Sequence, residues 1–582
     1  MLVCPGFSAP ALYESHSGGD QRVESLLFCF CVGPLAPGEP IEPPHRYAYW
    51  ADDAAASLYK GMKNRLPFAS LFLSVRVFTL LLLSALLPGQ EFMAQAAFPA
   101  DSGPVTYRQL RAHAQDLSTR PYTPAPIIAS KSLRSLSYDA YRRINFAADA
   151  AIWRGDAQPF RLQMFHPGFI HSKPVSIHLI EGEKSRRLPF SADLFDYRDS
   201  PIDTALPDAA GFAGFRVHYP INSPDVHDEF LVFLGASYLR AVGRDTVYGL
   251  SARGLAVNTV GPGAEEFPRF SHFYIERPTA GCDEIVIHAL LDSPSVTGAY
   301  RFTVTPGKQT RIKVDASLYP RHDSLRVGIA PLTSMFLFNS SNRPGFDDFR
   351  HAVHDSSGLQ IQQADGERIW RPLANPTRVQ VASFGAVSSL PRGFGLMQRT
   401  QAFDQFSDNE ARYDKRPSLW IEPLNDWGNG RIELLEIPTA NEYQDNIVAY
   451  WRPETGLMSG GEYRFRYRMR WGADDNFAQE PGRVMTTASG AGPGDNERLF
   501  VIDYSDGRQL QSLAAGDAAL RVRATASAGE IVHAGGELVD ATGRYRAYVR
   551  FAPEQAELSE LRVMLEIDGR QWGETWLYRW TE

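Results

Sequence analysis

Cysteine is scarce in this sequence. Four cysteines occur in 582 residues, and Cys4, Cys29 and Cys31 all precede residue 62. The rest of the chain contains Cys282 alone, so it can form no internal disulfide. A chain without disulfides must be held together by apolar cores, and this one is long enough to bury more than one.

Several chemical signatures are also missing. The segment "GFAGFRVHYP" from Gly211 lacks the Lys-Ser/Thr pair of a phosphate-binding loop, and no G-x-S-x-G nucleophile elbow occurs. His166, His171 and His178 have no cysteine or carboxylate partner at ligand spacing, so we expect no metal and no other cofactor. The formal net charge of −8 argues against a nucleic-acid partner, which favours a basic face.

One strongly apolar segment begins at Met62. A positive region precedes the apolar run from Val77 to Leu87, and Ala94-Gln95-Ala96 fits a cleavage site. We predict a secretory signal peptide over residues 62–96, and no membrane span should remain after its cleavage. No twin-Arg pair precedes the apolar run, so export should follow the general secretory route. The alternative is an internal membrane anchor, for which the run is short. If residues 62–96 are a signal peptide, which belongs at an N-terminus, residues 1–61 would be a non-native upstream extension.

Short strands dominate the rest of the chain. A helix is predicted from Thr106, where "TYRQLRAHAQDL" places Leu110, Ala114 and Leu117 on one side, and Ser137 could cap a second one. Beyond them, segments such as "TRIKVDASLY" alternate apolar and polar residues, with Gly, Pro, Asn and Asp between the runs. This pattern is typical of a large antiparallel β-sandwich, which we assign to residues 97–471.

A second module follows a polar segment without periodicity. The run "YRFRYRMRW" alternates up to Trp471, and residues 472–484 then read as a linker. Beyond it, "ALRVRATA", "RYRAYVRFA" and "LRVMLEIDGR" are three short strands separated by turn residues. About 100 residues with this spacing suggest an immunoglobulin-like sandwich over residues 485–582.

Carboxylates are the remaining catalytic candidates. The segment "RHAVHDSSGLQIQQADGERIWRPLANP" from Arg350 places Asp355 beside His354, before a Ser-Ser-Gly turn. Glycoside hydrolysis needs two carboxyl groups, one to protonate the leaving oxygen and one to activate water. Spacing alone cannot pair residues on strands, and a turn-capping or arginine-paired carboxylate is the more frequent explanation. The other candidates are Asp292, Glu265, Glu266, Glu436 and Asp445.

Tryptophans and arginines gather in one half of the large domain. Such a mixture suits a neutral hydroxylated ligand, which stacks on rings and accepts forked hydrogen bonds, although a tryptophan in a sandwich is usually part of the core. The residues alone therefore leave a sugar cleft as a hypothesis. The residues concerned are Trp370, Trp420, Trp427, Trp451, Arg371, Arg399, Arg412 and Arg416.

Longer segments resemble a known family, the osmoregulated periplasmic glucan biosynthesis proteins G and D. The resemblance runs in order through "FLVFLGASYLRAVGRDTVYGLSARGLAVNT", "GAEEFPRFSHFYIERP", "ALLDSPSVTGAYRF", "PLTSMFLF", "VHDSSGL", "IWRPLANP", "GFGLMQR", "RYDKRPSLWIEP" and "ELLEIPTANEYQDNIVAYW". It covers nearly all of the chain after the signal peptide, and more loosely the last module, which ends in "ETWLYRW".

The resemblance implies an all-β fold, with a large galactose-mutarotase-like β-sandwich followed by a small immunoglobulin-like one. It implies a periplasmic protein that acts on β-1,2-glucan beside an inner-membrane glucosyltransferase. Some members, the D type especially, are inverting β-1,2-glucanases, and their motif makes Asp355 the general acid. From the matching segments we assign nine residues to substrate binding: Tyr248, Arg253, His354, Trp370, Arg371, Arg416, Trp420, Glu436 and Asp445.

The general base stays open at this point. Glu265, Glu266 and Asp292 are our candidates, and if Arg269 stands at the base position the chain resembles the G type, with weak hydrolysis. The missing twin-Arg signal also favours the G type. Three functions compete: an inverting endo-β-1,2-glucanase, a non-catalytic glucan-binding partner of the glucosyltransferase, and a branching transglycosylase.

Overall fold

The computed structural model describes residues 103–582, except 129, 199–210, 260, 262, 344, 386–388, 478 and 515–519. The upstream segment 1–61 and the predicted signal peptide 62–96 therefore lie outside the described residues. Among the helices that are described, none is long and apolar enough to cross a membrane.

Two large sheets carry most of the strands and confirm the all-β class. The ten-stranded sheet has the order β2 (Arg161–Phe165), β6 (Gly214–Ser223), β7 (Val226–Leu234), β8 (Tyr238–Ala241), β9 (Ser251–Arg253), β15 (Val327–Ser334), β24 (Ile447–Pro453), β23 (Gly430–Glu436) and β20 (Gln380–Phe384), with β10 (Leu255–Val257) beside β15. The fourteen-stranded sheet has the order β28 (Leu520–Ala526), β31 (Leu558–Ile567), β32 (Arg570–Thr581), β19 (Arg368–Pro372), β18 (Gly358–Gln362), β21 (Gly393–Met397), β22 (Ser418–Pro423), β25 (Tyr463–Gly472), β14 (Thr310–Pro320), β13 (Val296–Thr305), β12 (Ile285–Asp292), β11 (Arg269–Glu276), β3 (Ser176–Glu181) and β4 (Lys184–Arg187).

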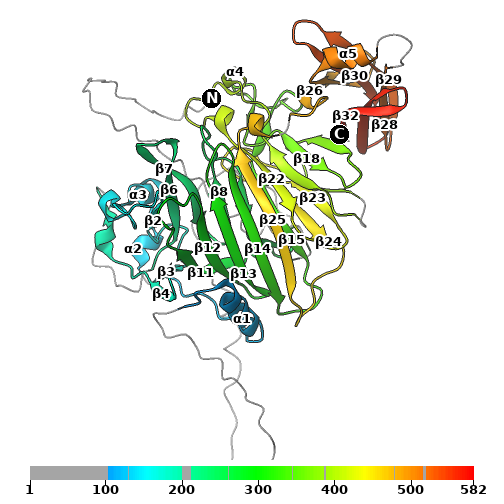
Figure 1. Cartoon of the computed structure of the whole chain (residues 1–582). Helices are drawn as coiled ribbons and strands as arrows, with labels where there is room; N and C mark the ends of the chain where they lie inside the picture. The colour runs from blue at the N-terminus through cyan, green and yellow to red at the C-terminus, as the bar shows by residue number, and fades with distance from the viewer. Residues whose placement is uncertain are drawn as a thin grey trace, which may run out of the picture. The chain divides into compact units, whose positions relative to one another are not determined.

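These two sheets pack face to face around one aromatic-rich core. Phe233 on β7 of one sheet contacts Phe302 on β13 of the other, with ring centroids 5.2 Å apart. Strand β14 confirms the predicted alternation, because Ile312, Val314 and Leu318 are buried in this core. Strands β12, β13, β14 and β25 lie side by side (Figure 1).

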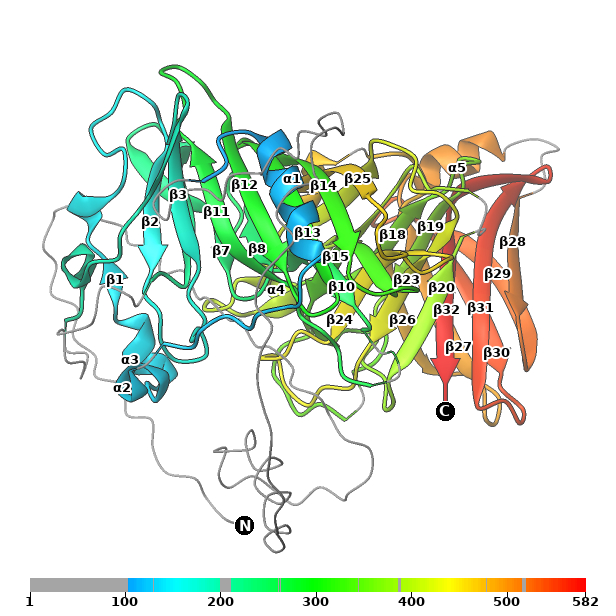
Figure 2. The same ribbon diagram turned by 90° about the horizontal axis from the view of Figure 1, so that it is seen from below.

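Short helices decorate the sandwich. Helix α1 (Tyr107–Ser118) begins as predicted, with the Thr106 side chain and Gln109 forming a reciprocal cap, and it lies across β12 to β14 (Figure 2). The Ser137 hydroxyl accepts a hydrogen bond from the N–H of Ala140 and caps α3 (Tyr138–Arg142). The others are α2 (Lys131–Arg134), α4 (Phe403–Phe406), α5 (Gly507–Leu513), η1 (Ala148–Ala150), η2 (Ala192–Leu194), η4 (Tyr413–Lys415) and η5 (Asp474–Asn476).

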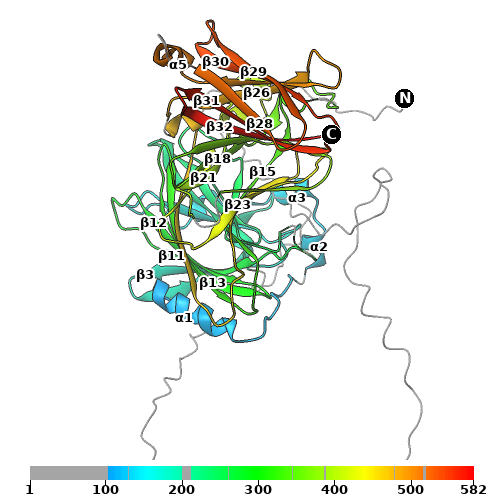
Figure 3. The same ribbon diagram turned by 90° about the vertical axis from the view of Figure 1, so that its right-hand side faces the viewer.

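The strands from β26 (Val484–Ala491) onward form most of a second core, to which Trp370, Met397 and Trp420 of the large sandwich also contribute. A four-stranded sheet of β26, β27 (Arg498–Tyr504), β30 (Arg544–Ala552) and β29 (Glu530–Val539) faces β28, β31 and β32 (Figure 3). Phe500 on β27 contacts Trp576 on β32, with ring centroids 5.6 Å apart.

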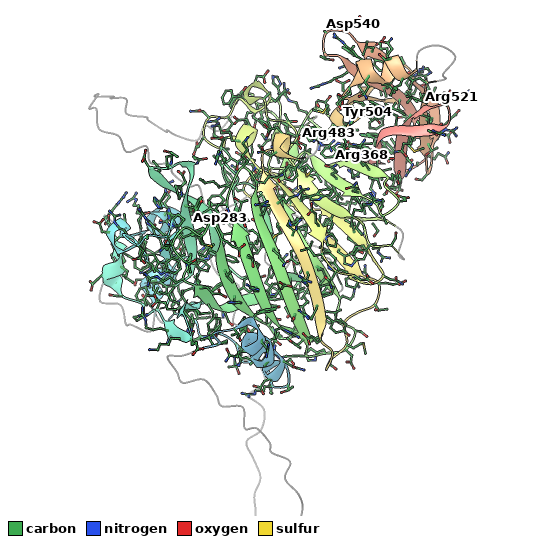
Figure 4. The ribbon with its side chains drawn as sticks, viewed as in Figure 1. Asp283, Arg368, Arg483, Tyr504, Arg521 and Asp540 are labelled. Atoms are coloured by element: carbon green, nitrogen blue, oxygen red, sulfur yellow. The ribbon has the colours of Figure 1, made fainter. Side chains whose placement is uncertain are left out.

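This second module is continuous with the long sheet. Strand β32 pairs in parallel with β19, with Trp370 opposite Trp576. Arg368 and Arg483 lie near this junction (Figure 4), where Arg368 donates to the carbonyl of Pro481 and Arg483 pairs with Asp474 at 2.7 Å. The segment predicted as a linker contains η5 and joins β25 to β26. The domain boundary at 472–484 stays a prediction, because hydrogen bonds cross from one module to the other.

Candidate active site

A short hairpin positions Asp355. Strand β16 (Phe336–Phe338) pairs with β17 (Val353–His354), and the N–H of Asp355 donates to the carbonyl of Met335 at 2.8 Å. The turn ends at Gly358, where a Cβ atom would lie 2.4 Å from the ring of Trp370. Glycine is therefore required for β18 to leave the turn against this tryptophan.

Asp355 lies in the wall of a cavity of about 140 Å³. The lining mixes charged and aromatic side chains from two parts of the large sandwich, residues 232–249 and 335–445. We call this the Asp355 cavity, and it is lined by Val232, Arg240, Tyr248, Gly249, Met335, Asp355, Asp408, Glu410, Ala411, Tyr413, Arg416, Glu442, Tyr443 and Asp445.

Asp355 is nearly inaccessible and loosely paired. Burial raises its pKa above the ordinary value, and this effect exceeds the opposite effects of Arg416 and Arg240. The nearest cation, Arg416, lies 3.5 Å from Oδ1, and this oxygen accepts no hydrogen bond from the described part of the chain. A carboxyl in such a place keeps its proton at higher pH than an exposed one and can donate it into the cavity.

Asp445 is a second carboxyl of the cavity whose pKa is raised by burial. Its pKa is raised to about 6, chiefly by burial, with Arg240 lowering it and Asp355 raising it further. Arg240 lies 3.9 Å away, and the side chain of Asp445 is 20% exposed. Two carboxyls with separate environments in one site are the usual basis for dividing acid and base roles.

Two other carboxylates in the cavity wall, Asp408 and Glu442, are engaged by one arginine. The guanidinium of Arg350 donates to Asp408 at 2.7 Å and to Glu442 at 2.8 Å, and it also pairs with Asp348 at 2.8 Å. Glu442 in addition accepts a hydrogen bond of 2.6 Å from the hydroxyl of Tyr413. This network fixes three loops around the cavity and leaves Asp355 and Asp445 outside it.

A larger cleft of about 1220 Å³ adjoins the cavity. The two share Tyr248, Glu410, Ala411 and Arg416 in their walls. The cleft then continues over β2, β6, β7 and the segment 138–171. A chain-like ligand could therefore pass from the cleft to Asp355.

The structure brings together four of the predicted site residues. Asp355, Tyr248, Arg416 and Asp445 all line the Asp355 cavity. His354 lies beneath it, stacked on Phe336 with ring centroids 5.4 Å apart, and burial lowers its pKa to about 4.

Five other predicted binding residues do not line the cavity. Arg371 and Glu436 form a buried ion pair of 2.9 Å within the sandwich. Trp370 packs against the second module, with the guanidinium of Arg399 3.6 Å from its ring centroid, and Trp420 belongs to the same core. Arg253 lies between the rings of Tyr238 and Phe267. These five side chains make contacts within the protein, and their assignment to substrate binding stays a prediction.

The three predicted base candidates are likewise absent from the cavity lining. Glu265 pairs with Arg253 at 2.8 Å, Glu266 accepts a 2.6 Å hydrogen bond from Ser295, and Asp292 pairs with Arg321 at 2.9 Å. Each of these carboxylates is held by a local donor, and their role as base stays a prediction.

The sequence reasoning missed several lining residues, above all Arg240, Tyr413 and Glu442. Each lies in a segment that carries the family resemblance, a few residues from one that was named. The His, Cys, Asp and Glu side chains that the structure describes include no group of three able to hold a metal ion.

Comparison with known proteins agrees with the resemblance. The model of the family "Periplasmic glucan biosynthesis protein, MdoG" matches residues 105–580. "Glucans biosynthesis protein G" of Shewanella frigidimarina is 44% identical over 473 residues, which cover 80% of this chain and 83% of that protein. The protein of the same name from Rhodopseudomonas palustris is 44% identical over 474 residues, covering 81% and 92%.

Among solved structures, a galactose mutarotase related enzyme from Lactobacillus acidophilus is similar at 10% identity, covering 47% of this chain and 94% of the enzyme. Its TM-score of 0.19 is too low to carry an argument. The sequence matches are decisive, and this chain belongs to the periplasmic glucan biosynthesis protein family, as a member of its G type.

Proposed function

We propose that this chain works in periplasmic glucan biosynthesis as an inverting endo-β-1,2-glucanase. The family supports the pathway, and the Asp355 cavity supports the reaction. The single observation that carries the proposal is the buried Asp355 carboxyl in the cavity wall, whose pKa is raised and whose Oδ1 accepts no hydrogen bond from the described part of the chain. A binding protein gains nothing from a carboxyl held in this way, whereas a glycosidase requires a carboxylic acid that can donate a proton.

In the proposed reaction Asp355 gives its proton to the glycosidic oxygen as the bond from that oxygen to the anomeric carbon breaks. Ionised Asp445 takes a proton from a water, whose oxygen bonds to the anomeric carbon on the opposite face. Water is thereby added across the linkage, and the new reducing end has the α configuration. Arg416, 3.5 Å from Asp355, stabilises the carboxylate that is left.

Asp445 takes the base role by comparison with its neighbours. Asp408 and Glu442 are already hydrogen-bonded to Arg350, while the contact of Asp445 with Arg240 is long at 3.9 Å. Its pKa of about 6 leaves it mostly ionised at neutral pH and still basic enough to accept a proton.

The proposed setting is the periplasm, beside an inner-membrane glucosyltransferase that supplies the nascent chain. Trimming would set the length of the glucan after its export. The enzyme needs no stable membrane span for this role.

The test uses the purified chain from Ala97 with linear β-1,2-glucan. We expect the wild type to release shorter oligosaccharides, and Asp355→Asn and Asp445→Asn to bind the glucan but cleave it at least about 100-fold more slowly, as for loss of a general acid or base. Binding without cleavage by the wild type would identify a glucan-binding partner of the glucosyltransferase. Longer or branched products would identify a transglycosylase.

A further inference from the structure

Exposed aromatic side chains are unusual on this molecule. Of the aromatic residues that the structure describes, Phe349, Tyr443 and Phe403 are the exposed ones, at 77%, 53% and 47%. An exposed ring stabilises the fold little, and a single one needs no explanation. These three belong to segments that reach the Asp355 cavity: Tyr443 lines it, Phe349 precedes Arg350, which binds the lining residue Asp408, and Phe403 begins α4, shortly before Asp408.

Arg350 places the rings on a common rim. It follows Phe349 in the chain, and its guanidinium binds Asp408 and Glu442. Both carboxylates line the Asp355 cavity, and Tyr443, which follows Glu442, lines it as well. The segment that contains Asp408 begins with α4 at Phe403.

Arginines also support the two phenylalanine rings. The guanidinium carbon of Arg350 lies 5.9 Å from the ring centroid of Phe349, and that of Arg412 lies 5.8 Å from the ring centroid of Phe403. Both distances are within the range of cation–π contacts. Arg412 lines the large cleft that adjoins the cavity. The rings are thus supported from one side while remaining accessible.

The cavity itself is too small for a glucan chain. Its volume of about 140 Å³ is below the roughly 300–1,000 Å³ of sites that hold a drug-sized ligand. Units on either side of the reacting linkage must therefore lie outside it, where the rim begins. A pyranose ring presents a face of C–H bonds that packs on an aromatic ring, while its hydroxyls stay in water.

We propose that Phe349, Phe403 and Tyr443 form stacking subsites that bind the glucan chain outside the Asp355 cavity. This inference rests on the proposed action on glucan. A protein partner fits less well, because the rings are separated by charged groups of Arg350, Arg412, Asp408 and Glu442, whereas the core of a protein interface is depleted of charge.

The test measures binding of linear β-1,2-glucan by calorimetry, with long and short chains, in the background of Asp355→Asn so that nothing is cleaved. Phe349→Ala, Phe403→Ala and Tyr443→Ala should each weaken binding of the long chain by about 3- to 10-fold. The double variant of the two phenylalanines should reduce the preference for long over short chains. Phe403→Tyr, which keeps the ring, should retain binding.

The matched control removes exposed apolar side chains elsewhere. Val532→Ala and Leu558→Ala in the second module, where these residues are 40% and 43% exposed, should leave affinity unchanged. The inference would be overturned if a variant with Phe349, Phe403 and Tyr443 all replaced by alanine bound the long chain as tightly as its parent. It would also be overturned if the control variants lost as much affinity as the aromatic variants. If the parent protein itself bound no glucan, the proposed action on glucan would be wrong. If the parent bound glucan and the aromatic variants bound it equally well, only the stacking subsites would be wrong.

Discussion

Asp355 and Asp445 occupy the same cavity under different local charges, and this difference determines the pH dependence that we expect. Asp445 titrates at about 6, and burial raises the pKa of Asp355 from its ordinary value. Activity should rise with pH through about 6, as Asp445 becomes ionised and able to accept a proton from water. The pH profile of kcat/KM measures this acidic limb. Residual activity of Asp445→Asn should lack the acidic limb, and an unchanged limb would remove Asp445 from the base role.

Asp445 should also lower the stability of the fold above a pH of about 6. Because its folded-state pKa is about 6 and exceeds the unfolded value, Asp445 favours folding at low pH, and this contribution is lost as pH rises through about 6. Asp445→Asn should therefore raise the free energy of unfolding by about 1–2 kcal/mol at pH 8. This is less than the full shift would give, since the side chain is 20% exposed. Denaturant titrations at pH 4 and pH 8 measure the effect. A variant that is less stable at pH 8 would contradict it.

Among the structural elements, the loops around the cavity depend on one side chain. Arg350 is 11% exposed and pairs with carboxylates from three segments. Arg350→Gln leaves Asp408 and Glu442 without their shared cation, so the free energy of unfolding should fall by about 2–4 kcal/mol. Amide hydrogen exchange should rise most in residues 403–415 and 438–445.

An exposed pair provides the comparison for Arg350. Arg523 binds Glu566 at 2.8 Å but is 58% exposed, so Arg523→Gln should change stability by less than about 1 kcal/mol. Equal effects of the two substitutions would show that Arg350 does not organise the loops.

Individual strands were predictable from the sequence, but their partners were not. The alternation in "TRIKVDASLY" and "YRFRYRMRW" predicts β14 and β25 because one side chain in two must face the core. Nothing local in "IWRPLANP" reveals that β19 pairs with β32, some 200 residues later, which buries Trp370 and Arg371 away from any ligand. Asp355 was found through its motif, while Arg240 and Glu442 reach the cavity only through the tertiary fold.

For the molecule as a whole, a buried ion pair joins the two modules. Arg399 and Glu574 are both inaccessible and 2.8 Å apart. Burial raises the pKa of Glu574, but the charge and hydrogen bonds of Arg399 outweigh this effect, so the net pKa lies below the ordinary value. The pair therefore stabilises the fold above the ordinary glutamate pKa, and this contribution is lost as pH falls. Glu574→Gln should lower the free energy of unfolding by about 3–5 kcal/mol at neutral pH.

Calorimetry should show one unfolding transition for both modules, in the wild type and in this variant, because β19 and β32 share a sheet. Two separate transitions in the wild type would mean that the modules fold independently.

Proton NMR of the wild-type protein with linear β-1,2-glucan tests hydrolysis by this chain, because it detects new reducing ends and their configuration in one experiment. We expect reducing-end signals to appear, with the α anomer first and the β anomer later by mutarotation. A glucan that stays intact with equimolar protein, although bound, would contradict hydrolysis at Asp355. A β anomer formed first would contradict the roles given to Asp355 and Asp445.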